Sequence, residues 1–248
     1  MQSNTVQLQA RVWRPLLKKC STAMDRACLR RDAYLDHVFA HEAWALKKEL
    51  PGPNSKESRN YLQRQLEDLD RVPVNFSLSP ASVAAVNDAC KELNIIRDCF
   101  INRVLFLLAA DIRTCEVVAG FDFHADLPEI LGDHERDYIY APLWGGGLYA
   151  VSEIVNSDPF RGLRNVIEHY RQQGDERASP LHACLILPGL FSRTPQELLA
   201  LNCYLPDQYV PGTPAAKDSG ELLVDLLGEP SRLSNRDPKP AGRRRKAR

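Results

Sequence analysis

One pattern occurs twice in the first 110 residues, and it constrains the fold more than any other feature of the chain. Each copy begins with alternating apolar and polar residues, as in a strand with one buried face, and continues into two stretches with helical apolar spacing. Leu8–Ala40 aligns with Val74–Phe106 at a constant offset of 66, without a gap. The sequence therefore predicts a duplicated strand-helix-helix unit.

The apolar positions of the two copies coincide, although few residues are identical. The aligned strand positions are Leu8 with Val74, Ala10 with Phe76, and Val12 with Leu78. Ser79 and Pro80 stand where an N-cap and a first-turn proline belong, and Asn94 suits a left-handed helix end. The first copy has Cys28 in place of Asn94, so we expect its turn to differ.

Neither copy can form a stable unit alone, because a single strand leaves its hydrogen-bonding edges open. Two strands can pair antiparallel as a ribbon, with four helices over the apolar face. This arrangement resembles the ribbon-helix-helix (Arc/MetJ-type) family of DNA-binding proteins, here as a tandem, single-chain pseudodimer over about residues 5–110. The resemblance implies a mainly α fold with a two-stranded antiparallel ribbon in a DNA-binding domain at 1–110, with repeats at about 5–47 and 71–110.

Residues 51–70, between the repeats, are expected to form a helical linker. Pro51 and Pro53 end the preceding helix, and Ser55 can cap a new helix that runs to about Leu69. An apolar stripe on this helix is expected to pack on the core, and it consists of Tyr61, Leu62, Leu66 and Leu69.

Strand alternation turns a polar face of the ribbon outward. In the family that the chain resembles, this face enters the major groove of DNA, where Gln and Asn can pair with adenine, Arg with guanine, and Ser with several base edges. The residues expected to contact bases are Gln7, Gln9, Arg11, Asn75 and Ser77. The two strands differ, so the target is expected to be asymmetric. The alternative is that these polar side chains only cover the solvent-exposed face of the ribbon and have no role in binding.

The start of each second helix offers backbone N–H groups and the positive end of the helix dipole to a DNA phosphate. Arg31 and Arg97 lie at these positions and are expected to add phosphate contacts. Their alternative role is that of a solvated arginine or a partner in an intrahelical pair. Asp32 and Asp98 are expected to cap these helices.

Charge is distributed unevenly, although the formal net charge of the chain is zero. Residues 1–110 carry 16 basic against 12 acidic residues, residues 111–235 carry 9 against 19, and the last 13 residues carry 7 against 1. Residues 229–248 are expected to form a disordered tail that adds sequence-independent attraction to DNA. Its phosphate-contacting residues are expected to be Arg243, Arg244, Arg245 and Lys246.

Residues 111–228 are expected to form a small mixed α/β domain. EVVAGFDF and LHACLIL have the character of strands, and FRGLRNVIEHYRQQ and TPQELLALNCYL that of helices. This domain is acidic and follows a basic domain that is expected to bind DNA. The combination favours a role for the acidic domain in self-association or in contact with another protein. We therefore expect a protein partner, or a second copy of the chain, to bind through 111–228.

Motifs for catalysis are weak in this second half. Asp122, His124 and Asp126 alternate as metal ligands can, but no matching motif follows. His182 and Cys184 lack a third residue for nucleophilic catalysis, and the glycine triplet of WGGGLYA lacks the context of a phosphate loop. We expect no enzymatic activity and no cofactor, with a metal-dependent nuclease as an alternative.

No apolar run approaches the roughly 18 residues of a membrane span, and no secretion signal is recognisable. The seven cysteines form no CxxC pair, so most are expected to be small buried hydrophobes. We expect a cytoplasmic, nucleoid-associated protein of prokaryotic, plasmid or phage origin. It is expected to bind double-stranded DNA sequence-specifically, as a transcriptional regulator or DNA-marking accessory factor. The alternative is an antitoxin or defence-system component that acts through a protein partner.

Overall fold

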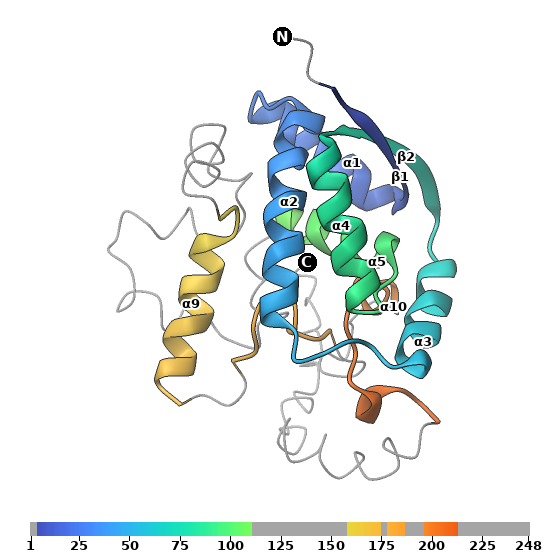
Figure 1. Ribbon diagram of the computed structural model, residues 1–248, viewed down its shortest axis with the longest axis vertical. Helices are drawn as coiled ribbons and strands as arrows, with labels where there is room; N and C mark the ends of the chain where they lie inside the picture. The colour runs from blue at the N-terminus through green and yellow to red at the C-terminus, as the bar shows by residue number, and fades with distance from the viewer. Residues whose placement is uncertain (1–3, 111–157, 175–177, 187–195, 213–248) are drawn as a thin grey trace, which may run out of the picture.

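A computed structural model describes residues 4–110, 158–174, 178–186 and 196–212 (Figure 1). Over these ranges the protein is mainly helical, with one two-stranded antiparallel sheet. The strands are β1 (Val6–Trp13) and β2 (Arg71–Leu78), and the helices are α1 (Arg14–Arg26), α2 (Arg31–Glu49), α3 (Lys56–Glu67), α4 (Pro80–Glu92), α5 (Arg97–Ala109), α9 (Arg161–Gln172) and α10 (Gln196–Leu199), with a 3₁₀ turn at Asp207–Tyr209. No helix in these ranges has the length and apolar character that crossing a membrane requires.

The two strands pair with Gln9 opposite Asn75. Because these positions are 66 residues apart, a local two-fold axis passes between them and relates one strand to the other. Alternate side chains point into the core, and the buried ones are Leu8, Ala10, Val12, Val74, Phe76 and Leu78. The antiparallel ribbon and its buried face, which the sequence predicts, are confirmed.

Three kinds of helix boundary repeat with the same offset of 66, the start and end of the first helices and the start of the second. The helices α1 and α4 both have 13 residues, and α2 and α5 begin at Arg31 and Arg97, although α2 is the longer of the two. Both first helices end in a left-handed residue, with φ of 57° at Cys28 and 50° at Asn94. The expectation that Cys28 makes its turn differ is wrong. The same backbone bond closes both turns, from Leu29 N–H to the Met24 oxygen (2.9 Å) and from Ile95 N–H to the Cys90 oxygen (2.8 Å).

Each second helix packs along the first helix of the other copy: α2 lies beside α4 and α5 beside α1 (Figure 1). The rings of Phe39 on α2 and Phe76 on β2 meet edge to face, with centroids 5.6 Å apart. Phe100 on α5 lies 6.4 Å from Phe39. The two copies therefore share one core, and neither could bury its apolar face without the other.

The predicted linker helix is present as α3. Ser55 is its N-cap, with a side chain that accepts the backbone N–H of Ser58 at 3.0 Å, as the sequence indicates. Leu62, Leu66 and Leu69 are buried and Tyr61 is partly buried, so the expected stripe packs on the core.

The later described segments add to the same core, through residues such as Phe160, Val166 and Leu201. The helix predicted at 160–173 is confirmed as α9, whereas the helix predicted at 194–205 is only α10 and ends at Leu199. The strand predicted at 181–187 is wrong over 181–186, where the chain makes turns. The strand predicted at 116–123 and the tail 229–248 lie outside the described residues.

Local hydrogen bonds explain why 181–186 is not a strand. The N–H groups of Ala183 and Cys184 both bond to the Pro180 oxygen at 2.8 Å. The side chain of Asn202 then takes the place of a neighbouring strand, because it accepts the Ile186 N–H and donates to the Ile186 oxygen, both at 2.9 Å. An apolar run is buried here without any strand pairing.

The two left-handed turns predict a difference in stability. Asn94→Ala should lower the free energy of unfolding by roughly 1–3 kcal/mol, because alanine is less suited to this conformation and the side-chain bond to the Asn54 oxygen (2.9 Å) is lost. Cys28→Ala is the matched control and should stay within about 0.5 kcal/mol of wild type, because both side chains carry a Cβ and the site is exposed. Urea unfolding measures both, and equal losses would contradict this account.

Candidate functional site

The five side chains expected to contact bases lie on one face of the ribbon. Gln7, Gln9, Arg11 and Asn75 are exposed and Ser77 is partly buried. Gln7 lies opposite Ser77, Gln9 opposite Asn75 and Arg11 opposite Pro73. The face therefore presents three rows of side chains across the ribbon, with the local two-fold axis through the central row.

The two ends of this face differ. At one end the Gln7 amide donates to the Ser77 hydroxyl at 2.7 Å, which holds both side chains in place. At the other end Arg11 lies beside Pro73, which has no polar side chain. Within the described ranges no acidic side chain pairs with Arg11. One end is therefore an oriented amide, and the other is an exposed cation without an acidic partner among the described residues.

Two arginines hold the central row from the helices behind it. Arg31 donates to the backbone oxygen of Asn75 at 3.0 Å, and Arg97 donates to the backbone oxygen of Gln9 at 2.7 Å. These bonds are equivalent under the offset of 66, and each joins one copy to the strand of the other. Arg31 also lies 5.4 Å from the centre of the Phe76 ring. Both side chains fix the ribbon, and contact with phosphate by either one stays a prediction.

Asp32 and Asp98 do not cap their helices, contrary to expectation. The N-cap residues of α2 and α5 are Arg30 and Ile96, and neither makes a side-chain cap bond. Asp32 instead accepts the Ser77 N–H of the ribbon at 3.0 Å, and Asp98 lies 3.7 Å from Arg71. A backbone N–H of the strand takes the first carboxylate and an arginine side chain the second, so neither is left to cap its own helix.

Burial alone would raise the pKa of Asp32. The hydrogen bonds from Arg31 and Ser77 outweigh this effect and lower the pKa. Asp32 is therefore ionised while it holds the Ser77 N–H.

The end of each strand is tied to a second helix by a further equivalent pair. Asn102 accepts the Trp13 N–H at 2.9 Å, and Asp36 accepts the Ser79 N–H at 2.7 Å. Asn102 also donates to the Arg11 oxygen at 2.9 Å. The ribbon backbone is thus held at its centre and at both ends, which leaves the outer side chains projecting from a fixed frame.

Several candidate positions lie outside the described residues. They are the tail residues Arg243, Arg244, Arg245 and Lys246, the alternating Asp122, His124 and Asp126, and the glycine triplet Gly145–Gly147. Their predicted roles stay predictions.

A buried ion network was missed by sequence reasoning, and its centre is Glu42 on α2. This fully buried carboxylate bonds to Arg164 at 2.7 Å, His182 at 2.7 Å and His41 at 2.9 Å. Glu49, two turns along the same helix, accepts from the Arg164 side chain and from the His182 backbone, both at 2.7 Å. The signal was two acids seven residues apart on the otherwise apolar face of α2.

The charges in this network compensate one another. Burial tends to raise the pKa of Glu42, but the Arg164 charge and the hydrogen bonds from His182 and His41 hold that pKa well below its ordinary value. Burial tends to lower the pKa of His182, but hydrogen bonding to Cys203 and Glu42 and the nearby carboxylates raise it to about 9. The bond to Glu42 is the better supported of the two, because the other ring nitrogen of His182, Nδ1, has no hydrogen-bond partner among the described residues. At neutral pH the network therefore contains an imidazolium.

His182 and Cys184 do not act as a pair. The imidazole bonds to Glu42, and the Cys184 thiol donates to the Ser179 oxygen at 3.0 Å. Burial raises the pKa of Cys184 to about 12, so this thiol is not an activated nucleophile. Cys20, Cys90, Cys99 and Cys203 are likewise buried, as expected for small hydrophobes.

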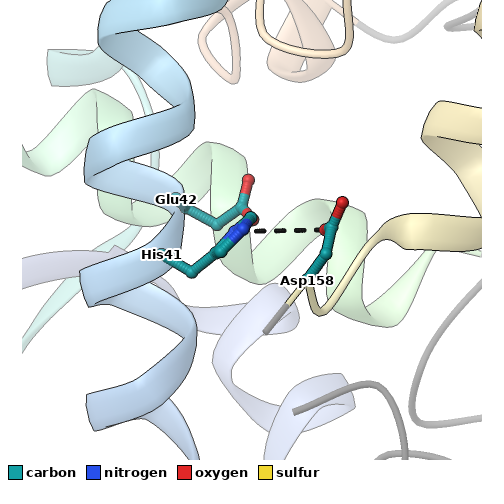
Figure 2. Close-up of side chains that lie close together, drawn as sticks. All are labelled: His41, Glu42 and Asp158. Atoms are coloured by element: carbon teal, nitrogen blue, oxygen red, sulfur yellow. Dashed lines mark hydrogen bonds and ion pairs between the residues drawn. The ribbon is translucent and has the colours of Figure 1, made fainter. Parts of the chain in front are cut away.

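His41, Glu42 and Asp158 lie close enough together to share a metal ion, as Figure 2 shows. Arg164, however, already bonds to both carboxylates, Glu42 and Asp158. A metal ion held by these two acids would lie against that guanidinium and lose affinity through repulsion. The cluster is better described as an ion pair network that joins α9 and 178–186 to α2.

Comparison of the chain with known protein families, with curated proteins and with solved structures found no match.

The network predicts a large effect for one arginine of α9 and a small effect for another. Arg164→Ala should lower the free energy of unfolding by about 3–5 kcal/mol, because it leaves buried carboxylates without their cation. Arg171→Ala removes the exposed partner of Glu168 and should cost less than about 1 kcal/mol. Denaturant titration of both variants measures this, and a small loss for Arg164→Ala would show that the network is dispensable.

His182 predicts a pH dependence. Its pKa is about 9 in the folded protein and 6.5 ordinarily, so its contribution to stability is complete below pH 6.5 and is lost as pH rises through 9. Wild type should lose on the order of a few kcal/mol across this window. His182→Gln should lack this part of the loss. Urea unfolding at a series of pH values gives the comparison, and parallel curves for the two proteins would count against a buried imidazolium.

Proposed function

We propose that this protein is a tandem ribbon-helix-helix protein of the Arc/MetJ type and binds double-stranded DNA sequence-specifically. The outer face of β1 and β2 enters the major groove, which is wide enough for a two-stranded ribbon. The protein acts without enzymatic chemistry, as a transcriptional regulator or DNA-marking accessory factor associated with the nucleoid.

The observation that carries the proposal is the polar outer face on a rigidly held ribbon. The side chains that project from it are suited to base edges, whereas the strand oxygens at the centre are engaged by Arg31 and Arg97. A reader of bases needs its side chains in a fixed register, and the equivalent bonds from both copies supply that register.

The starts of α2 and α5 support contact with the DNA backbone on both sides of the ribbon. Neither helix has a side-chain cap, so no cap side chain occupies the N–H groups of the first turn. Uncapped helix starts favour phosphate binding. Because their positions are equivalent about the axis, they suit two phosphates that flank one groove.

The unequal ends of the face favour an asymmetric target. Gln7, oriented by Ser77, keeps an amide oxygen and one N–H for adenine, whereas Arg11 can pair with guanine. The central row, Gln9 and Asn75, favours adenine on both strands of the site. The segment 111–228 is proposed to contact a protein partner or a second copy of the chain.

The test is selection of bound sequences from a randomised duplex library with the full chain. We expect an enriched asymmetric motif with guanine towards the Arg11 end. Arg11→Ala should weaken binding to that motif by about 1–3 kcal/mol, roughly 5- to 150-fold, and relax the preference at that position. Arg64→Ala, which removes an exposed arginine on α3, is the matched control and should keep both affinity and motif.

Two outcomes would contradict the proposal. One is the absence of an enriched motif, and the other is equal behaviour of the Arg11→Ala and Arg64→Ala proteins. Repeating the measurement at higher salt separates phosphate attraction, which falls steeply, from base preference at each position of the motif.

A further inference from the structure

Two adjoining cavities form a groove along α1, beside the end of α5. The first has a volume of about 220 Å³ and the second about 370 Å³, and Pro15, Lys19 and Ala109 line both. The groove follows α1 from Pro15 to Arg26, a length of about 16 Å at the rise of an α-helix. Together the two cavities reach the size of small-molecule sites, about 300–1,000 Å³. None of the roles assigned above to the ribbon or to the ion network uses this groove.

The two ends of the groove differ in chemistry. One end is apolar, and its lining includes Trp13, Leu16, Phe106, Ala110 and Leu198. At the other end Lys18 and Arg26 lie on either side of Thr22. Both cations are exposed. In the part of the chain that the structure describes, no acidic residue lines the groove and none pairs with Lys18 or Arg26.

The equivalent positions on the other side of the molecule lack both properties. The correspondences under the offset of 66 are Trp13 with Ser79, Leu16 with Ser82, Phe106 with Ala40, Lys18 with Ala84, and Arg26 with Glu92. The two serines line a polar cavity together with the acid Asp36. The fold therefore requires neither an apolar lining nor cations at these positions, and the groove combines them on one side only.

A ligand that is complementary to both ends has an apolar chain and an anionic group at one end of it. The apolar lining favours an alkyl chain, because each methylene group that leaves water adds affinity. Lys18 and Arg26 can donate charge-assisted hydrogen bonds to a carboxylate. We infer that the groove binds a medium-chain carboxylate, with its chain towards Trp13 and Phe106 and its carboxylate between Lys18 and Arg26. A nucleic-acid backbone would use the cations, but it has no part that suits the apolar end.

The test is calorimetric titration of the full chain with decanoate. Decyltrimethylammonium is the negative control, since its chain has the same length and its head group is a cation. We expect saturable binding of decanoate and none of decyltrimethylammonium, because Lys18 and Arg26 attract only the anion. Hexanoate and octanoate then measure the contribution of the apolar end. Each two added methylene groups should raise the affinity roughly 5- to 15-fold.

A double variant tests the cationic end. Lys18→Glu with Arg26→Glu should weaken decanoate binding at least about tenfold, because repulsion replaces the charge-assisted hydrogen bonds. The matched control is Lys56→Glu with Arg64→Glu, which reverses an exposed lysine and an exposed arginine of α3 at the same spacing. This control should bind decanoate as wild type does. All four side chains are exposed, so both variants should fold normally, which urea unfolding verifies.

Four results would each overturn the proposal. They are the absence of decanoate binding to wild type, equal affinities of the two double variants for decanoate, an affinity that does not change with chain length, and equal affinities for decanoate and decyltrimethylammonium. The second would place the ligand elsewhere, the third would mean attraction by charge alone, and the fourth would mean apolar adsorption alone. None of these results depends on whether the ribbon binds DNA.

Discussion

The pairing of β1 with β2 is the interaction on which the rest of the structure depends. Within the described ranges each strand has no other strand beside it, so the ladder between them has to be held by helices from both copies. Arg31 and Arg97 do this at the centre, and Asp36 and Asn102 at the ends. Because every one of these bonds crosses between copies or joins a strand to the helices behind it, the ribbon and the four-helix core form together.

Duplication within one chain allows the helices of the two copies to diverge in sequence, although the backbone pairing of the ribbon is symmetric. Glu42 of α2 corresponds to Leu108 of α5, and His37 corresponds to Arg103. Both second helices hold the segment 178–186, but with different groups: α2 uses the carboxylates of Glu42 and Glu49, and α5 uses Arg103, which donates to the Leu181 and Cys184 oxygens at 2.9 Å. A homodimer with two identical copies has no means to separate these roles.

The local pattern in the sequence was sufficient for the ribbon and the five helices up to Ala109, because each has its own apolar spacing, and for α3 and α4 the capping serines also marked the start. The prediction failed where backbone or charged groups form hydrogen bonds with side chains far away in the sequence. Ile186 has the character of a strand residue, yet Asn202 occupies its hydrogen bonds. Glu42 was missed for the same reason, since its partners Arg164 and His182 lie more than 120 residues away. Asp32 was expected to cap its own helix, and its carboxylate instead accepts the backbone N–H of Ser77 in β2.

Several of the groups that distinguish the first copy lie along one helix. From its start to its end, α2 carries the arginine that holds β2 and the two acids that hold the later segments. A buried ion network adds little to the free energy of unfolding compared with apolar residues of the same volume, which often stabilise a core equally well or better. We therefore assign this network a different role, which is to fix the position of α9 and of residues 178–186 against α2. The same helix therefore carries both the carboxylate at the centre of the network and the arginine that fixes the Asn75 side of the ribbon, whereas the position on α5 that corresponds to Glu42 is the uncharged Leu108.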